Sequence, residues 1–191
     1  MKRRVKLRNG TRNKWGANWP AKQKSRGLWI EPLDPKHDRA AFSCGVELLD
    51  TYLHKQAGQD LKKRVAVPFV ITPDGTTITG YYTLSQYSVQ LDEIPAEVAK
   101  KLPKYPIVPA TLLGRLAVSS AFRGQGHGTT LLMDALYRTL HRSLEVVSAG
   151  VIVDAKDAAA LAFYKKYGLL ELPRIERRLF LSMGTVEELF R

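Results

Sequence analysis

A basic turn with three glycines, residues 123–128, is the segment of this 191-residue chain that points most directly to a chemistry. An apolar run at 112–118 precedes it, and the helical repeat that follows has apolar residues on one face: Leu132, Ala135, Leu136 and Leu140. A strand, turn and helix of this kind aim backbone N–H groups and a helix N-terminus at one point, and glycine lets an anion approach closely. The segment therefore predicts a pyrophosphate site.

The spacing of the glycines excludes two common phosphate motifs. A dinucleotide-binding turn needs a third glycine where Thr129 stands, and a P-loop needs a lysine, which 105–155 lacks. Arg123, Gly126 and Gly128 instead match Arg-x-x-Gly-x-Gly, which resembles the acetyl-coenzyme A loop of the GNAT superfamily of N-acetyltransferases. A plain tight turn after a strand is the alternative.

A second segment strengthens the resemblance. Residues 150–154 predict a short strand, Asp157 is placed to cap the next helix, and Gly168 is placed to end it. The superfamily has Asn-x-x-Ala-x-x-Phe-Tyr-x-x-x-Gly-Phe here, and this chain matches at four positions: Ala160, Phe163, Tyr164 and Gly168. It departs at Asp157 and Leu169, which leaves open whether Asp157 contacts the coenzyme. The resemblance covers residues 28–183.

Five further segments narrow the resemblance to the GNAT toxins of bacterial toxin–antitoxin modules: 42–45, 49–50, 80–83, 102–106 and 113–118. That resemblance implies acetyl-coenzyme A as co-substrate and the α-amine of aminoacyl-tRNA as acceptor, so that translation is blocked. It also implies a ribbon-helix-helix antitoxin as partner, and it leaves open whether the chain forms a homodimer.

The resemblance also implies roles for individual residues. The backbone of 116–118 pairs with the pantetheine arm, the turn holds the pyrophosphate, and Tyr164 protonates the departing sulfur. The implied coenzyme contacts are Leu116, Ala117, Val118, Arg123, Gly124, Gln125, Gly126, His127, Gly128, Thr129 and Asp157. A phenol with a pKa of about 10 is protonated at neutral pH and can donate. The alternative for Tyr164 is aromatic packing beside Phe163, and Tyr167 is interpreted as packing.

A general base is hard to find in the sequence. Between Ile94 and Asp134 the one carboxylate is Glu97, while Asp154 at a strand end could be a base or a turn residue. An α-amine with a pKa near 8 is about a tenth neutral at pH 7, whereas a lysine amine is neutral in about one molecule in 2,500. Because this gap is worth about 3.4 kcal/mol, a site without a base favours the α-amines of aminoacyl-tRNA or protein N-termini.

Positive charge is concentrated at the N-terminus. Residues 1–27 hold ten of the 30 Lys and Arg and none of the 18 Asp and Glu. With Trp15 and Trp19 interleaved, this segment could grip nucleic acid through phosphate neutralisation and stacking. The alternative is an unstructured extension that begins at an upstream start codon, because the resemblance starts near Leu28. We therefore divide the chain into a basic, disordered extension, 1–27, and a GNAT acetyltransferase domain, 28–191.

Other basic residues are candidates for contact with RNA. One RNA-facing patch could consist of Arg39, Lys62, Lys63, Arg64, Lys100, Lys101 and Lys104. Lys62, Lys63 and Arg64 could instead complement the dipole of the helix that they end. Arg115 stands in a mostly apolar strand, where it could face substrate phosphates or a structural carboxylate.

Composition limits the remaining classes of protein. With 45% hydrophobic residues the chain predicts one soluble domain, and it has no apolar run long enough for a membrane span. Its basic N-terminus lacks the apolar stretch of a secretion signal. The single cysteine, Cys44, excludes an internal disulfide, suits a reducing cytoplasm and is expected to be inert packing. The four histidines are too scattered to predict a metal site.

Periodicity and turn residues predict the elements that carry these motifs. Strands are expected at 28–33, 65–72, 77–89, 112–118, 150–154 and 177–183, with a hairpin turn at 73–75. Helices are expected at 47–64, at 95–102, after the glycine turn and after Asp157. Pro103, Pro106 and Pro109 are expected to impose an extended loop. This order predicts an α/β, GNAT-like three-layer fold with a central mixed sheet flanked by helices.

Three functions remain open at this point: an aminoacyl-tRNA acetyltransferase toxin, an acetyltransferase of a protein N-terminus or small amine, and a non-catalytic module that binds coenzyme A or RNA. The intact glycine turn and Tyr164 argue against the third.

Overall fold

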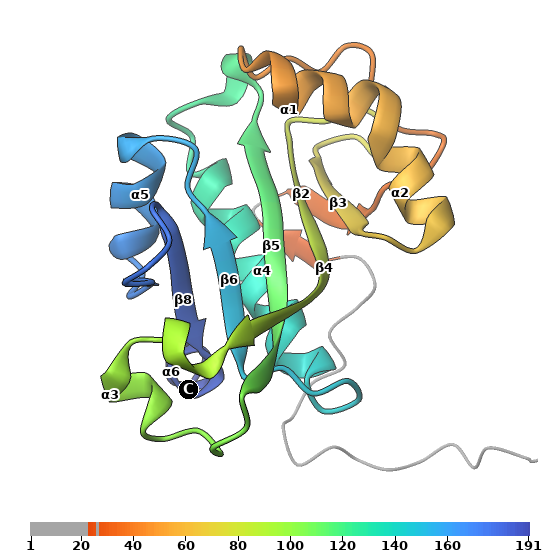
Figure 1. Cartoon of the computed structure of the whole chain (residues 1–191). Coiled ribbons are helices and arrows are strands. Elements are labelled where there is room, and N and C mark those ends of the chain that lie inside the picture. The colour runs from red at the N-terminus through yellow and green to blue at the C-terminus, as the bar shows by residue number, and fades with distance from the viewer. Residues whose placement is uncertain (1–22, 26) are drawn as a thin grey trace, which may run out of the picture.

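The computed structural model describes residues 23–25 and 27–191, and Figure 1 shows how their elements are arranged. Within this part of the chain, one eight-stranded sheet has the order β1-β2-β3-β4-β5-β6-β8-β7. Its strands are β1 (Gln23–Ser25), β2 (Leu28–Pro32), β3 (Val67–Thr72), β4 (Gly80–Gln90), β5 (Ile107–Val118), β6 (Gly150–Asp154), β7 (Leu170–Glu171) and β8 (Arg178–Ser182). Because β5 and β6 are parallel and the other neighbouring pairs are antiparallel, the predicted mixed sheet is confirmed.

Helices cover both faces of the sheet, as the predicted three-layer arrangement requires. On one face, α4 (His127–Arg142), α5 (Ala158–Lys165) and α6 (Met183–Leu189) share a core cluster, and α4 passes behind β5 in Figure 1. Two groups of helical segments pack on the opposite face of the sheet. One consists of α1 (Glu47–Thr51), a π-helical turn (Tyr52–Gln56) and α2 (Ala57–Lys63), and the other of a 3₁₀ turn (Leu91–Glu93) with α3 (Ala96–Ala99). A second 3₁₀ turn (Ser120–Phe122) leads into the glycine turn.

The composition of the core follows from the direction in which successive side chains of β4 and α4 point. Successive residues of a strand point to opposite faces, so Tyr82 packs with α4 whereas Tyr81 packs with the α1–α2 layer. Leu131, Leu132 and Leu136 of α4 are fully buried against the sheet. Burying each such side chain contributes about 1.5–3 kcal/mol to the stability of the fold. This packing fixes the helix that begins at the glycine turn.

One carboxylate, Asp134, is buried within this apolar layer. The Tyr82 hydroxyl donates to its Oδ2, and Arg138 Nε donates to the same atom at 2.7 Å. Arg138 also donates to the Ile30 carbonyl at 3.2 Å. Burial raises the pKa of Asp134, and the two donors act against that shift. The network therefore links α4 to β4 and β2 with hydrogen bonds.

The ladder between β5 and β6 is short. These parallel strands pair only at Thr111, Leu112 and Leu113, while β5 continues to Val118 beside β4. The register of β4 against β5 skips Gly114, which makes Gly114 the extra residue of a β-bulge. A bulge bends its strand and ends pairing locally, so β5 leaves β6 directly after Leu113.

The backbone of β5 beyond the bulge has one open side. Ser119 N donates to the Thr79 carbonyl at 2.9 Å, on the side of β4. Because backbone groups alternate along a strand, Leu116 and Val118 turn their N–H and C=O groups to the other side, where β6 no longer pairs. This edge of β5 can therefore pair with an extended ligand.

Two predicted elements have different bounds in the structure. The predicted proline loop does not extend to Pro109, because β5 begins at Ile107 and includes that proline. The Pro109 carbonyl accepts from Ala149 N at 2.8 Å, so its nitrogen also faces away from β4 and removes no bond from that ladder. The helix predicted at 47–64 is present but contains the π-helical turn, and its last residue, Arg64, is left-handed with φ of 59°.

The predicted extension, 1–27, falls mostly on residues 1–22 and 26, which lie outside the described residues. The part that is described, β1, pairs with β2 in antiparallel register, so the sheet begins before the predicted boundary at Leu28. β7 and α6 were not predicted, since each is short and has no motif of its own. None of the helices in the described part of the chain is both long and apolar enough to cross a membrane.

Gly150 gives a test of the packing at the start of β6. A Cβ there would overlap the Leu181 carbonyl oxygen and the Phe180 ring, and the carbonyl belongs to the β6–β8 ladder and cannot move aside. We expect Gly150→Ala to lower the free energy of unfolding by about 1–3 kcal/mol, as overpacking does. Gly184→Ala is the control, because the nearest atom to its Cβ would be Ser182 Oγ at 3.9 Å. Urea denaturation of both variants would measure the effect, and equal stabilities would contradict it.

Candidate active site

The glycine turn exposes the N-terminus of α4. Gly124 and Gly126 have φ of 76° and 82°, which favours glycine, and a Cβ at either would meet no atom within 4 Å. Thr130 N bonds to the Gly126 carbonyl at 3.1 Å and is the first amide of the helix ladder. The amides of His127, Gly128 and Thr129 precede it, so they are the unpaired donors that every helix leaves at its start. Open space beside these donors fits a pyrophosphate.

The turn is held by contacts with the segment before α1. The Arg123 guanidinium donates to the Cys44 carbonyl, and Ser120 N donates to the Ser43 carbonyl at 2.9 Å. Gln125 Nε2 makes a long bond, 3.5 Å, to the Ala121 carbonyl inside the turn. Arg123 therefore anchors the turn with its side chain, and its predicted role toward the coenzyme is left to its backbone.

Three predicted parts of the site converge at Gly128. A Cβ there would lie 3.9 Å from both Val118 of β5 and Phe163 of α5, so Gly128 brings the turn, the strand edge and the second motif together. Thr129 Oγ1 also bonds to Tyr167 Oη at 2.7 Å, which joins the first turn of α4 to the turn that follows α5. Tyr167 is thus more than a packing residue, because its hydroxyl links the two motifs.

His127 turns into the protein beneath the turn. Its ring is stacked 5.7 Å from the Phe122 ring, it is 6% exposed, and its Nδ1 is buried without a hydrogen-bond partner in the described part of the chain. Burial lowers the pKa of His127 below its ordinary value. The buried imidazole therefore supports the turn from below.

Tyr164 lies on α5 in the same core cluster as Val153, which pairs with Leu113 at the end of the β5–β6 ladder. Burial raises its pKa to about 12, so the phenol is protonated at neutral pH. No group of the described residues hydrogen-bonds its hydroxyl, and the hydroxyl is not one of the fully buried unpaired atoms. The structure therefore leaves a protonated donor available on α5.

The open edge of β5 involves two of the three predicted backbone positions. Leu116 and Val118 face it, whereas Ala117 pairs with Tyr81 of β4 and buries its side chain in the α1–α2 layer. Asp157 caps α5 by accepting from Ala160 N at 2.8 Å, as predicted, and its carboxylate also pairs with Lys156. Sequence reasoning missed the bulge that creates this edge, although Gly114 inside an apolar strand is a signal for one.

The two carboxylates considered as bases are engaged or distant. Asp154 accepts two bonds from Arg178, at 2.6 and 2.9 Å, and Arg178 also donates to Tyr87 Oη at 2.7 Å. Glu97 lies on α3, beyond the far end of β4 in Figure 1. Neither residue is placed as a free base at the open edge of β5.

Arg115 has no carboxylate partner among the described residues, and its predicted role toward substrate phosphates stays a prediction. Its guanidinium lies 3.6 Å from the centroid of the Tyr52 ring, a cation–π contact. Cys44 is 3% exposed, and burial is the main cause that raises its pKa to about 11, so its thiol is inert at neutral pH as expected. No cluster of His, Cys, Asp and Glu in the described part of the chain could hold a metal ion.

The predicted RNA-facing residues form two groups. Lys62, Lys63 and Arg64 are exposed at the end of α2, and Arg39 lies beside that helix. Lys100, Lys101 and Lys104 are exposed after α3, which Figure 1 shows at a different end of the sheet. The structure therefore separates the single predicted patch into an α2 group and an α3 group.

The site combines a strand edge open to an extended ligand, an exposed helix N-terminus and a buried phenol. Such a site can take a chemical group from a donor molecule that carries phosphate. The acetyltransferase (GNAT) family matches residues 41–169, and the chain belongs to this family. It is similar to the probable toxin TacT of Sinorhizobium fredii, with 32% identity over 84% of this chain and 93% of that protein. It is also similar to the tRNA-acetylating toxin of Mycobacterium tuberculosis, with 33% identity over 76% of this chain and 86% of that protein.

Solved structures of AtaT resemble the fold. AtaT complexed with acetyl-methionyl-tRNAfMet superposes with a TM-score of 0.80 at 30% identity, over 86% of this chain and 99% of that one. AtaTR bound with acetyl-coenzyme A gives 0.74 at 30% identity, over 86% and 98%. A mutant AtaT bound to the C-terminus of the antitoxin AtaR gives 0.72 at 28% identity, over 86% and 98%. The predicted GNAT-like fold and membership of the acetyltransferases are confirmed.

Gly126 allows an isosteric test of the anion site. Asp and Asn tolerate a left-handed φ, and Asp is a favourable helix cap, so Gly126→Asp and Gly126→Asn should both fold. Only Asp adds a negative charge beside the three free amides. A like charge about 4 Å away costs about 1 kcal/mol in water and about 4 kcal/mol near a protein surface. We therefore expect Gly126→Asp to bind acetyl-coenzyme A at least about fivefold more weakly than Gly126→Asn. Calorimetry giving equal affinities would exclude this turn as the pyrophosphate site.

Proposed function

We propose that this protein transfers the acetyl group of acetyl-coenzyme A to the α-amine of aminoacyl-tRNA, and that it acts as a toxin that blocks translation in the cytoplasm. One observation carries the proposal: the open edge of β5, the free amides of α4 and the α5 segment that carries Phe163 and Tyr164 meet around Gly128. The relatives support the acceptor, since one is a tRNA-acetylating toxin and AtaT has been solved with acetyl-methionyl-tRNAfMet.

Each part of the site fits a section of the coenzyme. The amides of His127, Gly128 and Thr129 would hold the pyrophosphate, with the helix dipole adding favourable charge. Leu116 and Val118 would pair with the pantetheine arm as a neighbouring strand does. The open space at Gly124 and Gly126 lets the ligand approach the backbone. Gly124, Gln125 and Asp157 would border it from the turn and from the start of α5.

Tyr164 would act on the sulfur. In the transfer, the amine nitrogen forms a bond to the acetyl carbon, the carbon–sulfur bond breaks, and the amine loses a proton. Tyr164 donates its proton to the leaving thiolate and recovers one from solvent. Its raised pKa keeps the phenol protonated until it donates to the thiolate.

The acceptor is an amine that does not need a base. Asp154 is held by Arg178, and Glu97 lies at the far end of β4, so an amine that is partly neutral at pH 7 is favoured. The α-amine of an aminoacyl ester meets this requirement and a lysine side chain does not. The basic groups of α2 and α3 would bind the RNA phosphates.

The same relatives suggest the protein partner. AtaT has been solved with the C-terminus of its antitoxin, so an antitoxin of the ribbon-helix-helix class is proposed here, together with a homodimer as the toxin unit. Co-expression with a small ribbon-helix-helix protein encoded beside this gene, if the locus has one, followed by size-exclusion chromatography with light scattering, would test both proposals.

The experiment that tests the acceptor uses acetyl-coenzyme A labelled in the acetyl group. We expect label on total charged tRNA, lost after mild alkali releases the N-acetyl amino acid. Uncharged tRNA should take up no label. Peptides with free N-termini serve as the competing acceptor, and labelling of these in preference to charged tRNA would contradict the proposal.

Replacing Tyr164 tests the general acid. Tyr164→Phe keeps the ring and its packing but removes the proton donor, so turnover should fall by about 10²- to 10⁴-fold. Affinity for acetyl-coenzyme A and thermal stability should change little, because the turn and the core are intact. Tyr167→Phe is the matched control: it loses the bond to Thr129, worth about 1 kcal/mol, and should keep most of the turnover. Full activity of Tyr164→Phe would show that another group protonates the sulfur.

The pH dependence follows from the two titrating groups. Only the neutral amine attacks, so kcat/KM should rise with pH up to the pKa of the acceptor amine, about 8 for a free α-amine, and then level off. The Tyr164 phenol, with its pKa raised to about 12, stays protonated across this range and causes no descending limb below pH 9. A bell-shaped profile centred between pH 6 and 8 in steady-state assays would reveal a base that the site does not show.

A further inference from the structure

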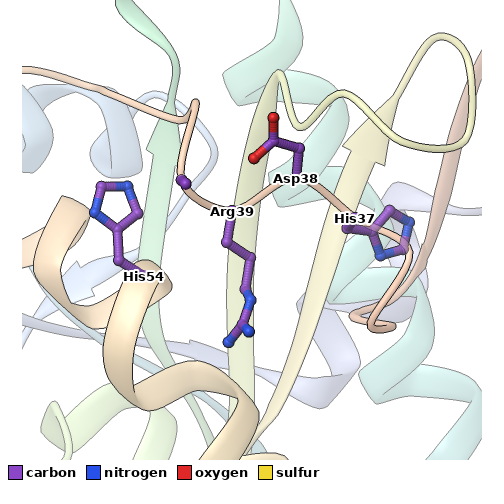
Figure 2. Close-up of a pocket in the computed structure, with 5 residues that line it drawn as sticks. His37, Asp38, Arg39 and His54 are labelled. Atoms are coloured by element: carbon purple, nitrogen blue, oxygen red, sulfur yellow. The ribbon is translucent and has the colours of Figure 1, made fainter.

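Arg39 occupies a hollow between the loop after β2 and the π-helical turn. Figure 2 shows the side chains that line this cavity of about 340 Å³, His37, Asp38, Arg39 and His54, with Ala40 completing it. The Arg39 side chain extends along α2, while the Asp38 carboxylate points to the other side of the loop, where it accepts from Ala41 N at 3.2 Å. Arg39 is thus the lining residue with a permanent positive charge.

The two histidines are already bonded within the protein. His37 Nδ1 accepts from Asp34 N at 2.9 Å, so its Nε2 carries the proton that is donated to Glu31 at 3.0 Å. His54 Nε2 donates to the Phe42 carbonyl at 2.8 Å. These bonds shape the wall of the cavity and leave the guanidinium as its free donor, since no carboxylate among the described residues pairs with Arg39.

The Arg39 side chain packs on α2 at the position of a glycine. A Cβ at Gly58 would lie 3.0 Å from Arg39 Nη1, so the absence of a side chain there makes room for the guanidinium. Lys55 stands three residues before Gly58 and Lys62 four residues after it, the spacings that place side chains on one helix face, and both are exposed. Arg39 therefore supplies, from another part of the chain, the missing cation between two lysines.

The neighbouring carboxylate of α2 does not cancel this row. Asp60 accepts a hydrogen bond from Tyr52 Oη at 3.0 Å, on the side of the helix that packs on the sheet. Lys63 and Arg64 extend the positive charge at the end of the helix, and both are exposed. Lys55, Arg39 and Lys62 thus form a cationic row with a hollow beside its centre.

We infer that this cationic row is a phosphate-binding site for the RNA backbone, with Arg39 as its central contact. The inference rests on the proposed function for the identity of the RNA, and it adds the place where the tRNA body is held, away from the acetyl-transfer site. The planar guanidinium, held on Gly58, can bind two phosphate oxygens at once, which the flanking lysines cannot do. Such a site recognises the charge of the phosphate groups and not the base sequence of the RNA.

Three variants separate the effect of the position of the Arg39 guanidinium on α2 from the effect of its charge. Arg39→Gln removes the charge and keeps the length of the side chain. Gly58→Gln leaves Arg39 intact but fills its seat with a neutral helix-forming residue, which only the flexible end of Arg39 opposes. Gly184→Gln is the control for a glycine replaced within a helix, on α6, where the nearest side-chain atom is Ser182 Oγ at 3.9 Å.

Binding to uncharged tRNA, measured by fluorescence anisotropy over a range of salt, is the main readout. Arg39→Gln should weaken binding several-fold at low salt and reduce the slope of log K against log salt by about one, the effect of one lost phosphate contact. Gly58→Gln should change affinity and slope in the same direction with unchanged or higher thermal stability. In the double variant the two effects should not add, because both remove the same contact. Gly184→Gln should bind like the wild type.

The inference is overturned if Arg39→Gln keeps the wild-type affinity and salt slope, or if Gly58→Gln and Arg39→Gln weaken binding additively. Acetyl transfer to a short aminoacylated acceptor without the tRNA body separates this result from the proposed function. That transfer should be equal in wild type and Arg39→Gln. If the wild type acetylates neither charged tRNA nor the short acceptor, the proposed function fails, whatever the binding data show.

Discussion

The early end of the ladder between β5 and β6 is the constraint on which the candidate site depends. Two parallel strands that stayed paired would satisfy each other's backbone groups and leave no edge for a ligand. The bulge at Gly114 turns β5 away from β6 after Leu113, while β4 continues to pair with β5 as far as Val118. Leu116 and Val118, both half-buried, thereby present donors and acceptors with which an extended ligand can pair.

The elements on both sides of this edge are linked to one another rather than merely adjacent. Tyr167, in the turn after α5, bonds to Thr129 of α4, and the Arg123 side chain donates to the Cys44 carbonyl in the segment before α1. Behind them, Asp134 connects α4 with β4 through Tyr82. Because the anion site, the strand edge and the proton donor share one framework, the distances between them are set by the fold, and positioning of this kind supplies much of the rate in transfer reactions.

Local sequence patterns predicted most of the helices, strands and turns, but few of the contacts between them. The glycine turn, the Asp157 cap and the hairpin at 73–75 depend on neighbours within a few residues, and the structure has them. The bulge at Gly114, the Arg123 anchor and the seat of Arg39 on Gly58 depend on residues far apart in sequence. The same limit explains the RNA-facing residues: charge in the sequence identified them, but only the fold divides them between α2 and α3.

Amide hydrogen exchange at single-residue resolution tests the central claim, that the open edge of β5 is the coenzyme site. Exchange of the Leu116 and Val118 amides should slow markedly when acetyl-coenzyme A is added, because the ligand would pair with them. The Ala117 amide, which already pairs with β4, is the internal reference and should change little. Unchanged exchange at Leu116 and Val118 with the protein saturated by acetyl-coenzyme A would contradict the account.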